Sequence, residues 1–275
     1  MMTDKVLNLP NYVTSDNLSL AWAACFLQLR QSDDKEIRPL FIRITGFDEK
    51  SEVIECNEIR AAVDKCLEEA DEQSVHTVAN TIFPQEIYGY SDNRSELYDL
   101  YKETMPARKA LSPHKNKFGL YFERLIDFGS GPEDGNQLEF IIKEYEKRPE
   151  VRKSLMQASV FDPGRDHTRM AQLPFPCLQH VSFAPNNEEG TLQINAFYAT
   201  QQIIPKAYGN YLGLCRLGAF MAKEMKLRLT SMNCFIGIEK MSEKSKFTAP
   251  CNRLEKYLEP ILDRCSINQL SEAVK

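Results

Sequence analysis

Residues 191–227 read TLQINAFYATQQIIPKAYGNYLGLCRLGAFMAKEMKL, and two consecutive elements are predicted from them. Its first nine residues, 191–199, are rich in β-branched and aromatic side chains and predict a strand. Residues 207–227 carry apolar side chains at the spacing of one helical face and predict a long amphipathic helix. The stretch VSFAP at 181–185 precedes the turn-rich NNEEG at 186–190, so we expect a pair of strands followed by a helix.

The rest of the chain alternates between helical and strand patterns. Helices are predicted at 18–31, 51–73, 136–148 and 253–265, the last of them interrupted at Pro260. Strands are predicted at 38–47 and 154–161. Helices interspersed with paired strands predict a mixed α/β or α+β fold with one large sheet. No repeat, low-complexity tract or Gly/Ser linker divides the chain, so we expect one domain over residues 1–275.

Composition limits the function. The chain has 275 residues, 43% of them hydrophobic, and a net charge of -5, which argues against a broad surface for duplex nucleic acid but allows a small basic pocket for one phosphate. No apolar run is long enough to span a membrane and no leader pattern opens the chain, so we expect a cytoplasmic protein. The eight cysteines form no C-x-x-C pair, so neither a metal site nor a disulfide framework is expected.

Cys177 lies in the segment LPFPCLQH at 173–180, directly after a proline and ahead of a predicted strand. A cysteine in such a place can be a small buried hydrophobe or a nucleophile. A nucleophile needs a thiol pKa lowered by cations or by a helix N-terminus. The nearby cations in the sequence are Arg152, Lys153, Arg165 and Arg169.

Three segments occur in an order that resembles the thymidylate synthase superfamily. They are EYEKRPEVRKSLMQASVFDP at 144–163, LPFPCLQH at 173–180 and NAFYATQQIIPKAYGNYLGL at 195–214. The resemblance extends from about Phe118 to Leu229, and residues 1–75 match weakly. It implies a thymidylate-synthase-like domain with a large mixed sheet flanked by helices, and a homodimer formed sheet to sheet.

The resemblance also implies a function, the folate-dependent transfer of a methyl or hydroxymethyl group to carbon 5 of a pyrimidine nucleotide. Cys177 would attack carbon 6 of the base, and 5,10-methylenetetrahydrofolate would donate the carbon. Asn210 would read the base edge, while Arg152 and Lys153 would reach the phosphate of the partner's nucleotide. Thr200 and Gln202 fall at further substrate-binding positions.

Several positions depart from the superfamily pattern. Ala199 stands where the principal phosphate arginine is expected, Gln202 replaces an aspartate that contacts folate, and Leu178 replaces a histidine. The segment TSMNCFIGIEK at 230–240 lacks the His and Tyr that would bind the sugar. Standard deoxyuridylate methylation is therefore not expected, and the sequence leaves open whether the base is uracil or cytosine.

Two further positions match the superfamily loosely. Asn80, in the apolar segment at 75–84, falls where a general-acid glutamate is expected, and because an amide cannot transfer the proton, Glu86 or another carboxylate would have to act. Arg43, in FIRITGF at 41–47, resembles the arginine of a phosphate-binding Arg-Thr-Gly loop, with the spacing off by one.

Structural explanations remain open for the same residues. Arg152 and Lys153 can form a solvated corner, Asn210 can cap a helix, and His180 can be an ordinary strand residue. A second hypothesis follows from the departures, namely a catalytically inactive relative that binds a nucleotide as a sensor or serves as a dimeric scaffold. A homodimer is expected under both hypotheses.

Overall fold

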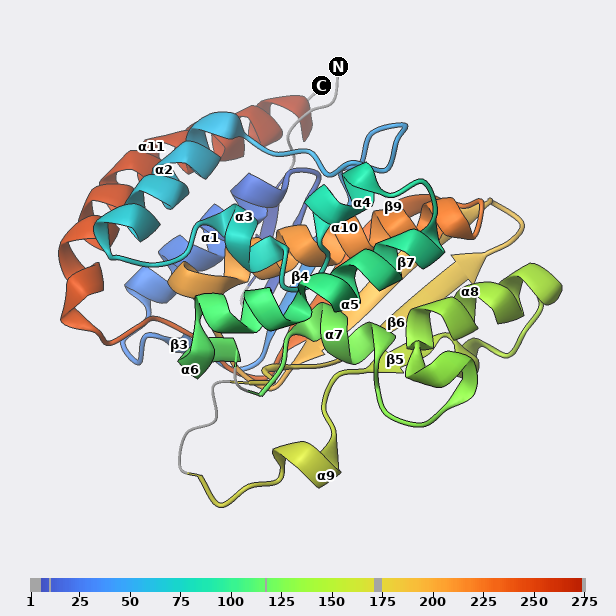
Figure 1. Ribbon diagram of the computed structural model, residues 1–275. Coiled ribbons are helices and arrows are strands. Elements are labelled where there is room, and N and C mark those ends of the chain that lie inside the picture. Colours follow the sequence, from blue (N-terminus) through green and yellow to red (C-terminus); the bar gives the residue numbers. More distant parts are fainter. Residues whose placement is uncertain (1–5, 10, 117, 171–174, 274–275) are drawn as a thin grey trace.

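The structure is a computed structural model that describes residues 6–9, 11–116, 118–170 and 175–273. A large sheet has the strand order β1-β2-β4-β9-β7-β6-β5 (Figure 1). Its strands are β1 (Val6–Leu9), β2 (Tyr12–Ser15), β4 (Leu40–Ile44), β5 (Gln157–Ser159), β6 (Leu178–Asn186), β7 (Thr191–Tyr198) and β9 (Arg228–Ile236). The pairs β2/β4 and β7/β9 are parallel and the others antiparallel, which confirms the predicted mixed sheet.

The stretch that opens the sequence analysis forms the centre of the molecule. Strands β6 and β7 pair as the expected hairpin, from Leu178 opposite Tyr198 to Asn186 opposite Thr191. The predicted helix follows as α10 (Tyr208–Glu224). It lies close against the sheet, because a Cβ added to Gly218 would come within 2.9 Å of Cγ2 of Ile194.

Helices cover one face of the sheet, as Figure 1 shows for α10, α5 and α7. The longer helices are α1 (Leu18–Gln31), α2 (Asn57–Glu69), α5 (Arg94–Leu111), α8 (Gln137–Lys147) and α11 (Thr248–Ala273). Shorter ones are α3 (Val75–Ala79), α4 (Gln85–Tyr90), α6 (Pro113–Asn116), α7 (Tyr121–Ile126) and α9 (Pro163–Asp166). The core lies between these helices and the sheet, where Trp22, Tyr211 and Phe220 are buried.

A second, small sheet has the strand order β3-β10-β8. Its strands are β3 (Glu36–Ile37), β8 (Gln201–Gln202) and β10 (Glu239–Lys240). Parallel pairing sets Gln201 opposite Glu239 and Gln202 opposite Lys240. The segment between β7 and α10 is thereby fixed beside the segment that follows β9.

Three sequence-based boundaries were wrong. The helix predicted at 51–73 begins only at Asn57, because Val53 bridges Phe47 in an extended segment. The closing helix is not interrupted at Pro260, since Leu254 and Leu258 pack into the core on the opposite side of α11 from the exposed proline. The strand predicted at 154–161 is reduced to β5, because a 3-10 turn at Lys153–Leu155 precedes it.

Candidate active site around Cys177

Cys177 immediately precedes β6, and its thiol is half-buried. Its carbonyl oxygen accepts a hydrogen bond from the backbone N–H of Ala199 at 3.2 Å. This bond extends the β6/β7 pairing by one residue and brings Thr200 and β8 alongside the cysteine. Two of the three segments on which the family resemblance depends, 173–180 and 195–214, therefore lie side by side.

Burial raises the pKa of the Cys177 thiol, and the positive charges of Lys206 and Lys240 act in the opposite direction. These two lysines were not among the cations expected from the sequence. Arg165, one of those expected, pairs instead with Asp162 at 3.1 Å. The cationic neighbours of Cys177 come from later in the chain, because β8/β10 pairing carries Lys240 to this end of the sheet.

Asn210 and Thr200 each carry a buried side-chain oxygen that has no hydrogen-bond partner among the described residues. Asn210 is 2% exposed and lies in the first turn of α10, whose N-cap position is Ala207. The interpretation of Asn210 as a helix N-cap is therefore wrong. A buried polar atom without a partner costs free energy, so these oxygens mark positions where water or a polar ligand group would be bound favourably.

Gln202 is half-buried in β8. Since side chains alternate along a strand, it points to the opposite side of the ribbon from Gln201, as Lys240 does from Glu239. The exposed Ala199 offers no hydrogen-bonding side chain. Of the residues predicted for the substrate, Thr200, Gln202 and Asn210 thus belong to segments that border Cys177.

A fully buried carboxyl group lies behind this surface. Glu239 is 0% exposed, and Tyr211 lies with its hydroxyl 3.3 Å from Oε2 of Glu239 and 3.0 Å from Oε1 of Gln201. Burial raises the pKa of Glu239 well above its ordinary value, and the contact with Tyr211 lowers it by less. A protonated Glu239 can donate to the Tyr211 oxygen while Tyr211 donates to Gln201, so the three groups form one chain.

Sequence reasoning missed Glu239, Tyr211, Lys206 and Lys240. Tyr211 and Lys206 lie in the quoted stretch, but nothing in their spacing separates them from packing residues. The other two lie in 230–240, a segment considered only for the His and Tyr that it lacks. Glu239 and Lys240 reach this region because β10 pairs with β8. Strands of two residues are too short to produce a recognisable hydrophobic period in the sequence.

Arg152 and Lys153 are exposed in the turn before β5. Neighbouring contacts place this turn along the half of β6 that is farther from Cys177, since Met156 O accepts from Phe183 N and Pro149 O accepts from the Asn187 side chain. Within one chain the structure does not bring these cations to the thiol. Neither has an ion-pair partner among the described residues.

Asn80 ends α3, and its polar contacts lie on the far side of α10 from β8. Its Oδ1 accepts from Arg216 Nη1 at 3.5 Å. Burial opposes ionisation of Glu86, but hydrogen bonds from Asn80 and His76 keep the pKa of that carboxyl below its ordinary value. Among the described residues, no hydrogen bond or ion pair joins Asn80 or Glu86 to Cys177.

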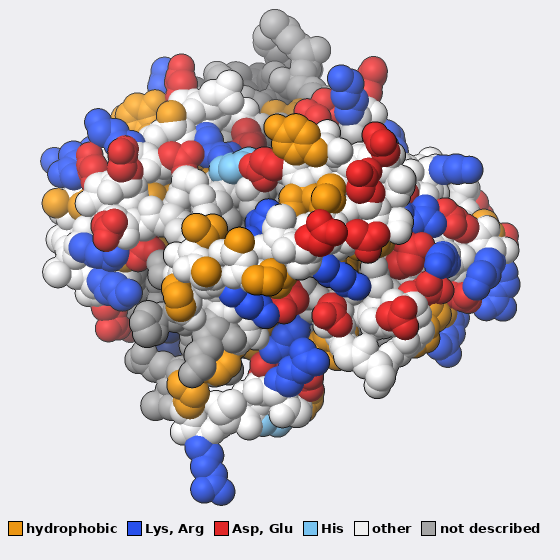
Figure 2. All heavy atoms as spheres, viewed as in Figure 1, with side chains coloured by type: hydrophobic (Ala, Val, Ile, Leu, Met, Phe, Trp, Pro, Cys, Tyr) orange, Lys and Arg blue, Asp and Glu red, His pale blue; other side chains and the backbone are white. Residues whose placement is uncertain are grey.

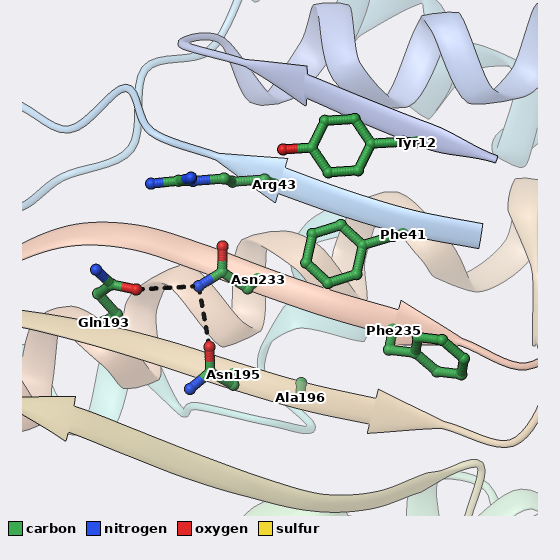
Figure 3. A pocket seen from close by; sticks show the side chains of 8 residues that line it. All are labelled: Tyr12, Phe41, Arg43, Gln193, Asn195, Ala196, Asn233 and Phe235. Carbon is green, nitrogen blue, oxygen red and sulfur yellow. Dashed lines mark hydrogen bonds between the residues drawn. The ribbon is translucent and has the colours of Figure 1, made fainter. Parts of the chain in front are cut away.

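Arg43 lies within β4 and not in a loop, on the sheet face that helices leave uncovered. Figure 3 shows it beside Asn233, with Gln193 and Asn195 on the next strand. Three strand spacings, or about 14 Å, separate β4 from β6. The structure therefore does not bring Arg43 together with Cys177.

The uncovered face carries a row of rings. Tyr12 stacks on Phe41 at 5.4 Å between ring centroids, and Phe197 stacks on Phe235 at 5.6 Å. Phe235 is 40% exposed. Tyr12, Phe41 and Phe235 line a shallow cavity of about 420 Å³ together with the polar residues beside them (Figure 3).

The face covered by helices is charged, whereas the uncovered face carries the row of rings. Acidic and basic side chains are interspersed over the helical face without a large patch of one sign (Figure 2). Among the described residues, no His, Cys, Asp and Glu side chains gather in a group of three that could hold a metal ion. No helix in that part of the chain is long and apolar enough to cross a membrane.

No protein-family model matches the sequence, and a search of curated protein sequences finds no match.

Proposed function

We propose that the protein is a transferase of nucleotide metabolism that adds a methyl or hydroxymethyl group to carbon 5 of a pyrimidine nucleotide. The observation that carries the proposal is the backbone hydrogen bond from Ala199 to Cys177, which sets a half-buried thiol next to the start of the segment that holds Lys206 and the unpartnered oxygens of Thr200 and Asn210. A nucleophile, positive charge for a phosphate and polar atoms for a base are the groups that this chemistry requires.

In the proposed reaction the sulfur of Cys177 bonds to carbon 6 of the base. The electron pair of the carbon 5–carbon 6 double bond moves onto carbon 5, which then acts as the nucleophile. After carbon 5 loses its proton, the sulfur leaves and the double bond forms again. The amide of Asn210, buried and with an unpartnered oxygen, suits the hydrogen-bonding edge of the base.

Lys206 and Lys240 would bind the anionic part of the nucleotide, in place of the arginine that the superfamily has at the position of Ala199. Their charge also favours the thiolate of Cys177 over the thiol. The half-buried amide of Gln202 fits the polar edge of a pterin. When bound there, 5,10-methylenetetrahydrofolate would supply one carbon at the oxidation level of formaldehyde: carbon 5 would bond to it as its bond to a folate nitrogen breaks, after which water would complete a hydroxymethyl group or a hydride from the reduced pterin a methyl group.

One observation favours the second hypothesis, an inactive relative that binds a nucleotide as a sensor or serves as a scaffold. Burial raises the pKa of Cys177, so the thiol of the free protein is mostly protonated at neutral pH. A catalyst would need the bound substrate or a nearby base to remove that proton. A sensor would use the same lysines and amides without needing the thiolate.

We also propose a homodimer in which two copies pack through the uncovered sheet face. The aromatic row of Tyr12, Phe41, Phe197 and Phe235 supports this arrangement, because stacked rings at the surface gain stability when a partner removes them from water. Such a dimer could bring the unpaired Arg152 and Lys153 of one copy toward the nucleotide of the other.

The test is the release of the carbon-5 hydrogen into solvent from a panel of uridine and cytidine nucleotides, with and without methylenetetrahydrofolate. Exchange with one nucleotide, lost in Cys177→Ser and kept in the matched variant Cys56→Ser, would support the enzyme. Cys56 is also half-buried but lies at the start of α2. Binding of a nucleotide without any exchange would support the sensor, and the absence of both would contradict the nucleotide site.

A further inference from the structure

A second cavity of about 690 Å³ lies on the far side of α10 from β8. It is bounded by α10, α4 and the loop at 49–55, and none of the residues that surround Cys177 lines it. Its volume is within the range of pockets that bind small organic molecules. The groups that decide what it could bind are a guanidinium, a set of aromatic rings and the balance of charges at its rim.

Arg216 extends into this cavity from α10 and is half-buried. Its guanidinium is oriented by Oδ1 of Asn80 at 3.5 Å and Nδ1 of His76 at 3.3 Å, and Nε2 of His76 pairs in turn with Glu86. No carboxylate of the described residues lies within ion-pair distance of it. Burial, followed by the charge of Arg60, lowers the pKa of Arg216, and the more distant carboxylates of Glu55 and Glu86 act in the opposite direction. An anion in direct contact with the guanidinium would therefore be stabilised in the cavity.

The remaining charges limit that anion to a single negative charge. Arg216 and Glu55 are the half-buried charged side chains of the lining, and the exposed ones at its rim are Lys50, Lys223, Arg228, Glu49 and Glu52. Glu55 is already neutralised, because it pairs with Arg60 at 2.9 Å and accepts from the Tyr208 hydroxyl at 2.8 Å. A phosphate dianion would face these carboxylates without a second buried cation.

One wall of the cavity is aromatic. Phe83 and Tyr88 each contact Phe220, with ring centroids 5.2 and 5.4 Å apart. Ala219 lies beside Phe220 on α10 and leaves room next to the rings. A wall of this kind favours an apolar or aromatic ligand body, since rings gain from edge and offset contacts as well as from burial.

We infer that this cavity is a binding site for an organic monocarboxylate with an aromatic body, and that Arg216 binds its carboxylate. Asn80 is then a positioning residue that holds the guanidinium toward the cavity. The inference does not depend on the proposed reaction at Cys177, because the two sites share no lining residue.

The experiment uses the full-length protein with 3-phenylpropionate as the probe and isothermal titration as the readout. The uncharged 3-phenylpropionamide and the dianion phenyl phosphate are compared under the same conditions. We expect the carboxylate to bind at least about tenfold more tightly than the amide, the effect of one charge-assisted hydrogen-bonded pair. Cys177→Ser should bind the probe unchanged, which separates this result from the fate of the proposed reaction.

Three variants test the site itself. Arg216→Gln should weaken carboxylate binding about tenfold or more while Arg216→Lys retains part of it, and Ala219→Phe should block the space beside Phe220. Lys226→Gln, an exposed change just beyond α10, is the control. Tighter binding of phenyl phosphate, equal binding of the amide, or binding that survives both Arg216→Gln and Ala219→Phe would overturn the inference, as would the absence of binding to folded wild-type protein.

Discussion

The hydroxyl of Tyr211 lies 3.0 Å from Oε1 of Gln201, and both side chains are buried. The contact joins the third residue after the start of α10 to the short strand β8. On the other side of the same hydroxyl lies Glu239, at 3.3 Å. An acidic group whose pKa is raised by burial thus lies inside the core, and this shift predicts a measurable effect on stability.

Glu239 should make the protein less stable as the pH rises. Its pKa is raised in the folded state, so above the ordinary value of 4.5 the unfolded chain releases a proton that the folded chain retains. The free energy of unfolding therefore falls by up to about 1.4 kcal/mol per pH unit, until the folded pKa is reached. In Glu239→Gln this fall should be absent, as measured by urea unfolding from pH 4.5 to 8.

The exposed variant Glu243→Gln is the control for that series. It should follow the wild-type profile throughout. Parallel profiles for Glu239→Gln and wild type would show that Glu239 ionises in the folded protein, and would contradict the neutral carboxyl.

Gly209 should not tolerate a side chain. A Cβ at this position would lie 2.5 Å from Cβ of Val78 and 2.7 Å from the carbonyl oxygen of Val75, where α10 crosses α3. Gly209→Ala should lower the free energy of unfolding by roughly 1–3 kcal/mol, the usual cost of overpacking. Gly89 lies in α4 with no atom within 4 Å of an added Cβ, so Gly89→Ala should be neutral or stabilise by about 0.5–1 kcal/mol. Equal effects in chemical denaturation would contradict the close helix crossing.

Arg124 and Asp166 form a buried ion pair with two hydrogen bonds, at 2.9 and 3.2 Å. Arg124 also lies over the ring of Phe175, two residues before Cys177, so the pair supports the approach to the cysteine. Removing one partner leaves a buried charge, and Asp166→Ala should destabilise by about 3–5 kcal/mol. The double variant Arg124→Met/Asp166→Leu should lose less than the sum of the single variants in a double-mutant cycle. Additive losses would show that the two side chains do not act as a pair.

The uncovered sheet face predicts the oligomeric state. Phe235→Glu places a charge among the stacked rings and should convert a dimer to a monomer in sedimentation experiments at micromolar concentration. Tyr90→Glu changes another exposed ring, on α4, and should leave the dimer intact. A wild-type protein that sediments as a monomer at all concentrations would remove the dimer, and with it the role proposed for Arg152 and Lys153.

Much of the fold could be predicted because its main elements have strong local periods. Helix α10 and the β6/β7 hairpin lie in consecutive residues, so spacing and turn composition sufficed to predict both. Val53 and Pro260 show the limits of such patterns. Their local sequence favours one state, and contacts with residues elsewhere in the chain decide for another.

The site could be predicted only where its residues lie in one stretch. Thr200, Gln202 and Asn210 follow β7 in the chain. The bond from Ala199 N to Cys177 O places the start of this stretch next to Cys177. Lys240 and Glu239 reach the same region by pairing with residues almost forty positions earlier, which no local pattern indicates. Asn80 shows a second limit of local patterns. A short apolar helix can pack on either side of α10, and α3 places Asn80 on the side away from β8.

The strands β3, β8 and β10 each consist of two residues, so few backbone hydrogen bonds hold the small sheet together. Such a ladder can open locally at a lower cost in free energy than unfolding of the large sheet. Local opening of this ladder would change the orientation of Lys240 and Glu239. A substitution that disturbs this ladder could abolish the reaction proposed for Cys177 while the melting temperature stays constant. A screen by melting temperature alone would then class that variant as unaffected.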